Sequence, residues 1–295
     1  MMSEKKRPFS LYKGALLVLI LAALVTVIYL AVGRDWLDGR NASDTERRTQ
    51  ELFYGQTSSA FSFFASASAE AVVDPEDLPV DARFAALYEQ NPDVVGWLKG
   101  GENIDAPVVQ RDNEYYMDHN FFGAEDRNGT LFINADNELD PRDDVLLIHG
   151  HNMKNGDMFG KLLSFREESY MREHPLVSFQ LATGEGEPWY VAIAAFDASM
   201  LPDERSYFDI TQILFDSDPV PAGQENAPRR SASFQAYLDS LQKRSYWPSP
   251  VDVSVEDRLL MLITCSYEQE DGRFVLVCRQ LREGETPESI FETAF

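Results

Sequence analysis

The chain has 295 residues, of which 44% are hydrophobic and 25% are charged, the composition of a globular protein large enough for one sizeable core. Its formal net charge of −23 argues against a nucleic-acid partner, because repulsion would oppose a phosphate backbone throughout its approach. We therefore expect no nucleic-acid binding.

A membrane anchor is predicted near the N-terminus. Residues 14–33, GALLVLILAALVTVIYLAVG, are uncharged and mostly apolar, and as a helix they would be about 30 Å long, which matches a bilayer core. Lys5, Lys6 and Arg7 precede them, which predicts a cytoplasmic tail over 1–13 and export of the remainder. A cleaved signal peptide is the alternative, but its apolar region usually has about 7–15 residues.

The next segment, residues 34–80, is polar and rich in serine and alanine, and we expect a stalk or linker that is partly helical. ARFAALYEQ, residues 82–90, has helical spacing. This helix should end at Asn91, because the proline that follows disfavours helix in the residue before it. The remaining chain, 81–295, is then expected to form a single main domain.

Strand-like segments dominate after this helix, with turn residues between them. They are VVGWLKG, APVVQ, GTLFINA, DDVLLIHGH, LVSFQLA and WYVAIAAF. Many short strands of this kind predict a mainly β fold, either a barrel or a sandwich. One amphipathic helix is expected at 233–245, preceded by a long exposed loop over 201–230.

The two cysteines, Cys265 and Cys278, could form a disulfide in an exported chain. However, LLMLIT (259–264) and RFVLVC (273–278) predict an antiparallel hairpin in which Cys265 faces Arg273 at the loop. Cys278 then lies five residues along the partner strand, roughly 16 Å away. Because a disulfide needs Cα atoms within about 7 Å, we expect no bond between the cysteines and a core position for Cys278.

Two histidines, His149 and His151, follow an apolar strand and should point to the same face. Together with a cysteine they could bind zinc. The chain has no CxxC, no HExxH and no third histidine at ligand spacing, so we expect no metal and no other cofactor.

A lone cysteine at a strand end is more often a small buried apolar residue than a nucleophile. Here Cys265 would lie at the mouth of the hairpin, across from Arg273, with a histidine at the end of another strand. A thiol, a proton partner and an anion-stabilising group are the parts needed for covalent acyl transfer. Residue patterns alone indicate nothing more specific.

These same segments resemble a known family. LITCSYEQEDGR resembles the TLxTC signature of sortases, with an arginine eight positions after the cysteine, and IHGHNMKNGDMFGKL resembles the histidine segment of class B sortases. The likeness continues through NPDVVGWLKGGENIDAPVVQ, DNEYYMDHNF and GTLFINADN, so it covers roughly residues 82–281. The resemblance implies a closed eight-stranded β-barrel with N-terminal helices and a helix before the last two strands.

The resemblance also implies roles for individual residues of this chain. The resemblance implies that Cys265 is the nucleophile, His151 the catalytic histidine, and Arg273 the arginine that holds substrate and stabilises the oxyanion. Thr264 and Asn113 correspond to positions beside the substrate, with Thr264 supporting the site rather than reacting.

The chain departs from the family pattern at two positions that bear on peptide specificity. His149 and Ala106 stand where class B sortases commonly have tyrosine.

Sortases cleave a sorting-signal peptide after threonine, hold the acyl group as a thioester, and transfer it to an amine of a peptidoglycan precursor or a pilin lysine. The resemblance therefore implies those partners and a catalytic domain on the outer face of the membrane of a Gram-positive-type bacterium. Two alternatives stay open, namely a cysteine peptidase that hydrolyses the peptide, and a catalytically idle wall-binding or pilus-scaffold module.

Overall fold

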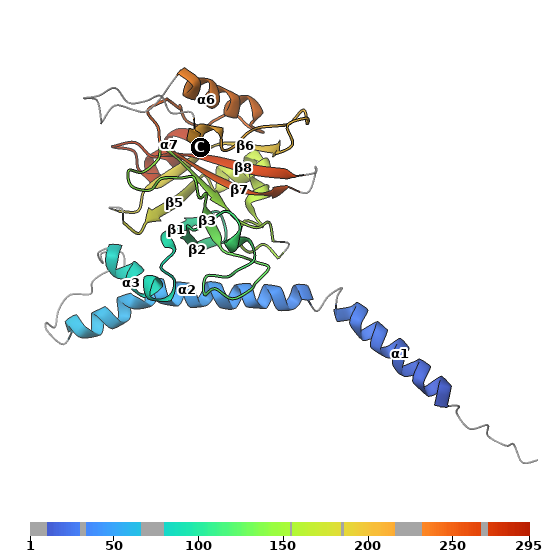
Figure 1. The fold of residues 1–295 in the computed structure, drawn as a ribbon. Helices are drawn as coiled ribbons and strands as arrows, with labels where there is room; N and C mark the ends of the chain where they lie inside the picture. Colours follow the sequence, from blue (N-terminus) through green and yellow to red (C-terminus); the bar gives the residue numbers. More distant parts are fainter. Residues whose placement is uncertain are drawn as a thin grey trace, which may run out of the picture.

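The computed structural model describes residues 11–29, 34–65, 80–153, 155–183, 186–215, 232–266 and 271–295. Eight strands close into a barrel in the order β1-β2-β3-β4-β7-β8-β6-β5 (Figure 1). The strands are β1 Val94–Gly100, β2 Ile104–Val109, β3 Leu131–Ile133, β4 Val145–His149, β5 Leu176–Leu181, β6 Trp189–Ser199, β7 Leu259–Ser266 and β8 Gly272–Gln280. The prediction of a mainly β fold, and of a closed eight-stranded barrel, is confirmed.

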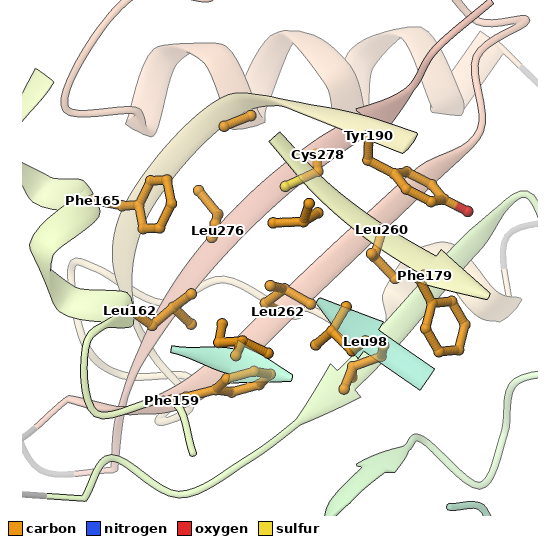
Figure 2. Packing of buried hydrophobic residues seen from close by; sticks show 14 of the residues in the cluster. Leu98, Phe159, Leu162, Phe165, Phe179, Tyr190, Leu260, Leu262, Leu276 and Cys278 are labelled. Carbon is orange, nitrogen blue, oxygen red and sulfur yellow. The ribbon is translucent and has the colours of Figure 1, made fainter. Parts of the chain in front are cut away.

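Alternating side chains of each strand fill the barrel interior. Leu260 and Leu262 from β7, and Leu276 and Cys278 from β8, belong to one buried cluster that also contains Leu98 of β1. Figure 2 shows these side chains converging between the strands. The intervening residues of β7 and β8 therefore point outward.

The predicted amphipathic helix covers part of the outer wall as α6, Ala232–Arg244 (Figure 1). Its buried Phe234, Leu238 and Leu241 pack in one cluster with outward residues of the last two strands, such as Met261 and Val277. The helix lies between β6 and β7 in the chain, so it precedes the last two strands as the resemblance implied. The remaining short helices are η3 Tyr115–Met117, η4 Leu162–Arg166, α4 Glu168–Glu173, α5 Gln212–Phe215 and α7 Pro287–Ala294.

Three helices precede the barrel: α1 Leu11–Ile28, α2 Arg34–Ala65 and α3 Val80–Gln90. The predicted end of α3 is confirmed, since the helix stops before Asn91-Pro92. The whole of α2 lies within the segment 34–80 that was expected to be a partly helical stalk, while residues 66–79 of that segment lie outside the described residues.

Part of the predicted stalk packs against the barrel. The ring of Phe53 in α2 stacks on Trp97 of β1 with centroids 4.1 Å apart. Tyr54 donates a hydrogen bond to a carboxylate oxygen of Asp105 at 2.8 Å, and Gln50 donates to the Asp105 carbonyl at 3.0 Å. The domain boundary at residue 81 stays a prediction. However, buried residues of α2 pack against the barrel.

The predicted anchor over 14–33 overlaps α1, and its last residues, 30–33, lie outside the described part of the chain. Among the residues that the structure describes, no helix is both long and apolar enough to cross a membrane. The structure therefore does not support the transmembrane helix. Most of the predicted tail, residues 1–10, and residues 216–230 of the predicted long loop also lie outside the described residues.

Candidate active site

The hairpin that carries both cysteines has the predicted register. Cys265 is paired with Arg273 at the loop end of β7 and β8, whereas Cys278 is paired with Leu260 further along the same two strands. Both thiols are free. The expectation that Cys265 and Cys278 are not bonded to each other is confirmed.

The two cysteines also lie on opposite faces of the barrel wall. Ile263 and Val275 pack outside the barrel, so Cys265 and Arg273, each two residues further toward the loop, lie on the outer face. Cys278 lies in the interior cluster with no exposed surface. One hairpin therefore presents one thiol to the outside and keeps the other in the core.

A pocket of about 240 Å³ opens on this outer face. It brings together the five site residues predicted from the sequence, Asn113, His151, Thr264, Cys265 and Arg273, and it also contains His149. None of the described residues that line it is an aspartate or a glutamate, although the chain has a net charge of −23. Among the described residues of the pocket wall, a thiolate would therefore face the cation of Arg273 and no carboxylate.

The histidines reach this pocket because β4 runs parallel to β7. Their pairing continues to the end of β4, where His149 is the partner of Ile263. The strand ends there, and His151 follows in an irregular segment. Because Ile263 is two residues before Cys265, the end of β4 delivers both imidazoles to the cysteine.

Two hydrogen bonds fix Gly150, which joins the two histidines, to β7. Its amide donates to the Ile263 carbonyl at 3.1 Å, and the hydroxyl of Thr264 donates to its carbonyl at 2.7 Å. Thr264 is only 2% exposed. Its hydroxyl proton is thus used within the protein, which fits the expectation that Thr264 supports the site.

Asn152 fixes the segment on the other side of His151. Its side-chain amide donates to the carbonyl of Cys265 at 3.0 Å, and the carbonyl of His151 itself accepts from the amide of Phe159 at 3.0 Å. The main chain around His151 is therefore tied to the cysteine-bearing strand both before and after the histidine.

The imidazole of His151 has one hydrogen bond in the described part of the structure. Its Nε2 lies 2.6 Å from the carbonyl oxygen of Met117, the last residue of η3. The carbonyl can only accept, so Nε2 carries the proton in this arrangement, and in the neutral ring Nδ1 is the unprotonated nitrogen.

His149 has a different environment. Its ring stacks on Phe132 with centroids 5.2 Å apart, and its Nε2 lies 3.4 Å from the side-chain nitrogen of Asn134. Burial, and secondarily the nearby charge of Arg273, lower the pKa of His149 to about 4. This imidazole is therefore uncharged at neutral pH and adds no second positive charge beside Arg273.

Arg273 and Asn113 complete the pocket. The guanidinium of Arg273 donates to the carbonyl of Gly272 at 3.0 Å, and this is the one hydrogen bond that its five N–H groups make to the described residues. The side-chain oxygen of Asn113 accepts from the amide of Ala135 at 2.8 Å, which joins the loop before η3 to the loop after β3.

Two contributors to this site were not predicted from the sequence. Asn152 lies directly after His151, and its polar side chain at that position was a usable signal. Met117 acts through its main chain, so its side chain carried no signal. Arg166 is not among the described residues that line the pocket, but it pairs with Asp197 at 2.9 Å and reaches the hydroxyl of Ser266, the residue after Cys265, at 3.2 Å.

The chain is similar in sequence to two known sortase B proteins. No protein-family model matches the chain. Sortase B of Listeria monocytogenes is 30% identical over 194 residues, which are 64% of this chain and 70% of that protein. The chain belongs to the class B sortase family. Sortase B of Staphylococcus aureus is 26% identical over 207 residues, which are 69% of this chain and 76% of that protein.

Solved class B sortases share the fold. A Staphylococcus aureus sortase B–substrate complex has a TM-score of 0.61 at 21% identity, covering 83% of this chain and 99% of that chain. Sortase B of Clostridium perfringens has a TM-score of 0.53 at 24% identity, covering 67% and 99%. Sortases are cysteine transpeptidases of the cell surface of Gram-positive bacteria, and this is the reaction class to which membership assigns the chain.

Proposed function

We propose that this sortase cleaves a C-terminal sorting-signal peptide after threonine and transfers the acyl group to an amine of a peptidoglycan precursor or a pilin lysine. Cys265 is the nucleophile, His151 the general acid and base, and Arg273 the group that stabilises the oxyanion. The observation that carries this assignment is the pairing of Cys265 with Arg273 in a pocket that also contains His151.

The first half of the reaction forms the thioester. His151 takes the thiol proton of Cys265, and the thiolate attacks the carbonyl carbon of the peptide, whose oxygen becomes an anion. Arg273 offers that oxygen paired N–H donors with a permanent positive charge. When the intermediate collapses, the C–N bond breaks, His151 gives its proton to the leaving amine, and the acyl group stays on sulfur.

The second half reverses these roles. An incoming amine loses a proton to His151 while it attacks the thioester, and the thiolate leaves as the new amide forms. A free thiol has a pKa near 8.5 and an imidazole near 6.5, so the reactive ion pair is a minority species unless local charge favours it. Arg273 is a positive charge beside Cys265, and the described residues that line the pocket include no carboxylate.

Attachment to the membrane is part of the proposal. Many large apolar side chains of α1, from Leu16 to Val27, are more than half exposed. An exposed apolar surface of this kind is better suited to contact with lipid than with water. Fractionation of cells that express the full chain tests this point. Recovery of the enzyme in the membrane fraction, with release when residues 1–33 are deleted, is expected, and recovery of the full chain in the supernatant would contradict it.

The reaction itself is tested by weighing products. The full chain is incubated with a panel of threonine-containing sorting peptides, with and without glycine or lysine amines, and the protein and peptides are analysed by mass spectrometry. We expect an acyl adduct on Cys265, absent from Cys265→Ala, and a shift of product from free acid to amide when an amine is present.

The alternatives give other outcomes in the same experiment. An adduct that yields only the free acid, whatever amine is supplied, would identify a hydrolytic cysteine peptidase. No adduct across a broad panel would favour a non-catalytic wall or pilus scaffold.

A further inference from the structure

We infer that the main-chain carbonyl of Met117 is the group that orients His151, holding its proton on Nε2 so that Nδ1 exchanges protons with the thiol and the amine. This inference rests on the proposed function, in which His151 is the general acid and base. In such sites the base is commonly held by a third group, and here that group is a peptide carbonyl.

The position of this carbonyl is fixed by its own neighbours. Met117 ends η3, and its amide donates to the carbonyl of Glu114 at 3.0 Å. The carbonyl of Tyr116, one residue earlier, accepts from the amide of Thr130 at 3.0 Å. The turn is thus tied to the segment that enters β3, and the Met117 oxygen reaches His151 at 2.6 Å as a pre-positioned acceptor.

Gly129 leaves the room that this contact needs. Its φ of +61° is a left-handed conformation that favours glycine. A Cβ atom here would lie 2.4 Å from the Tyr116 oxygen, 3.1 Å from the Met117 oxygen and 3.2 Å from Cδ2 of His151. Any side chain at position 129 would therefore push first on the Tyr116 carbonyl, and then on the Met117 carbonyl and the imidazole of His151.

The position of the proton on Nε2 determines which nitrogen of His151 transfers protons. With Nε2–H bonded to the carbonyl, the neutral ring accepts the thiol proton on Nδ1 and becomes an imidazolium. The Nε2–H bond to the carbonyl then involves a charged donor and is stronger, which stabilises the ion pair. Nδ1 later gives its proton to the leaving amine, and the proton on Nε2 is never transferred.

The tautomer can be measured without any substrate. The full chain has four histidines, so labelling with ¹⁵N-histidine gives few NMR signals, and the signals that disappear in His151→Gln belong to His151. At alkaline pH, the neutral ring should show the Nε2–H tautomer, with a protonated-type shift at Nε2 and an unprotonated-type shift at Nδ1. An Nδ1–H tautomer, or the averaged shifts of a freely exchanging ring, would overturn the inference.

A matched pair of variants tests the role of Gly129. Gly129→Ala should convert His151 to averaged tautomer shifts and should slow acyl-enzyme formation by up to about 10²-fold, the scale of a small misplacement of a reacting group. Gly123→Ala is the control, because Gly123 also has a positive φ, +77°, but its Cβ would meet only the Tyr115 hydroxyl at 3.5 Å. The control should keep the Nε2–H tautomer.

The outcomes separate this inference from the proposed function. Unchanged His151 shifts in a folded Gly129→Ala variant would overturn the role of the glycine, and if that variant does not fold, the wild-type tautomer decides. Absence of a thioester on Cys265 in wild type would contradict the proposed reaction while leaving the tautomer result intact.

Discussion

Cys265 and Cys278 lie thirteen residues apart in one hairpin, and the barrel wall separates their environments. Cys278 points inward among leucines, where Figure 2 shows it beside Leu260, Leu276 and Tyr190. Burial raises the pKa of its thiol well above the ordinary range. Cys265 points outward into a pocket with an arginine and two imidazoles.

The comparison shows that position within the β pleat decides what a thiol can do. A thiolate is the reactive form, and an apolar interior opposes its formation while a neighbouring cation favours it. Strand alternation assigns Cys278 to the first environment and Cys265 to the second.

The largest effect should come from the cysteines themselves. Cys265→Ala should abolish peptide cleavage, because no other thiol reaches the pocket in the described structure, whereas Cys278→Ala should keep most of the activity per folded molecule. Removing a buried sulfur from the core should lower the melting temperature of Cys278→Ala only. Equal loss of activity in both variants would contradict the contrast.

The two histidines give the next effect. His151→Ala should lower turnover by about 10²–10⁴-fold, the contribution typical of a general acid and base. His149→Tyr should keep most of the activity, because His149 is uncharged at neutral pH and stacks on Phe132 as a tyrosine ring could. Turnover numbers with one sorting peptide compare the variants, and greater damage from the His149 change would show that the histidine roles are reversed.

Arg273→Lys should have a smaller effect. The charge beside Cys265 is kept, but the rigid pair of N–H donors is lost, and removal of an oxyanion donor typically costs about 10²–10³-fold in turnover. Peptide binding should change less than turnover. If only binding weakens, Arg273 holds the peptide and does not stabilise the oxyanion.

The smallest effect is a pH dependence of stability. The pKa of His149 is about 4 in the folded protein, and near 6.5 in an unfolded chain. As pH falls from about 6.5 to about 4, the unfolded chain takes up a proton that the folded protein does not, so stability should fall, by at most roughly 3 kcal/mol. Melting temperatures across this range should fall less steeply in His149→Phe, and identical slopes would show that His149 is not the group responsible.

Local patterns predicted most of the barrel. All eight strands, α3 and α6 were expected from alternation, helical spacing and turn residues. The register of the hairpin followed from placing its loop between Cys265 and Arg273 in the sequence. These features depend on residues close in sequence, so the sequence carries them directly. The closure of the strands into a barrel came only from the resemblance to sortases, and the order of the strands was not predicted.

Long-range packing was harder to predict. The segment of α2 around Phe53 was expected to be a stalk because its composition is mostly polar. The aromatic ring of Phe53 stacks on Trp97, a long-range contact that the composition does not indicate. The transmembrane helix expected from residues 14–33 is not supported by the described residues. Within the site, the sequence supplied the reacting groups, but the main-chain carbonyl of Met117 has no signature in any side chain.

The most direct test of the contrast is the rate at which each thiol is alkylated in the native protein. The full chain is treated with iodoacetamide at neutral pH, and modified peptides are quantified over time by mass spectrometry. Cys265 should be modified far faster than Cys278, and Arg273→Ala should slow Cys265 without changing Cys278. Comparable rates for the two thiols in the folded wild type, or an intramolecular disulfide between them, would contradict the account.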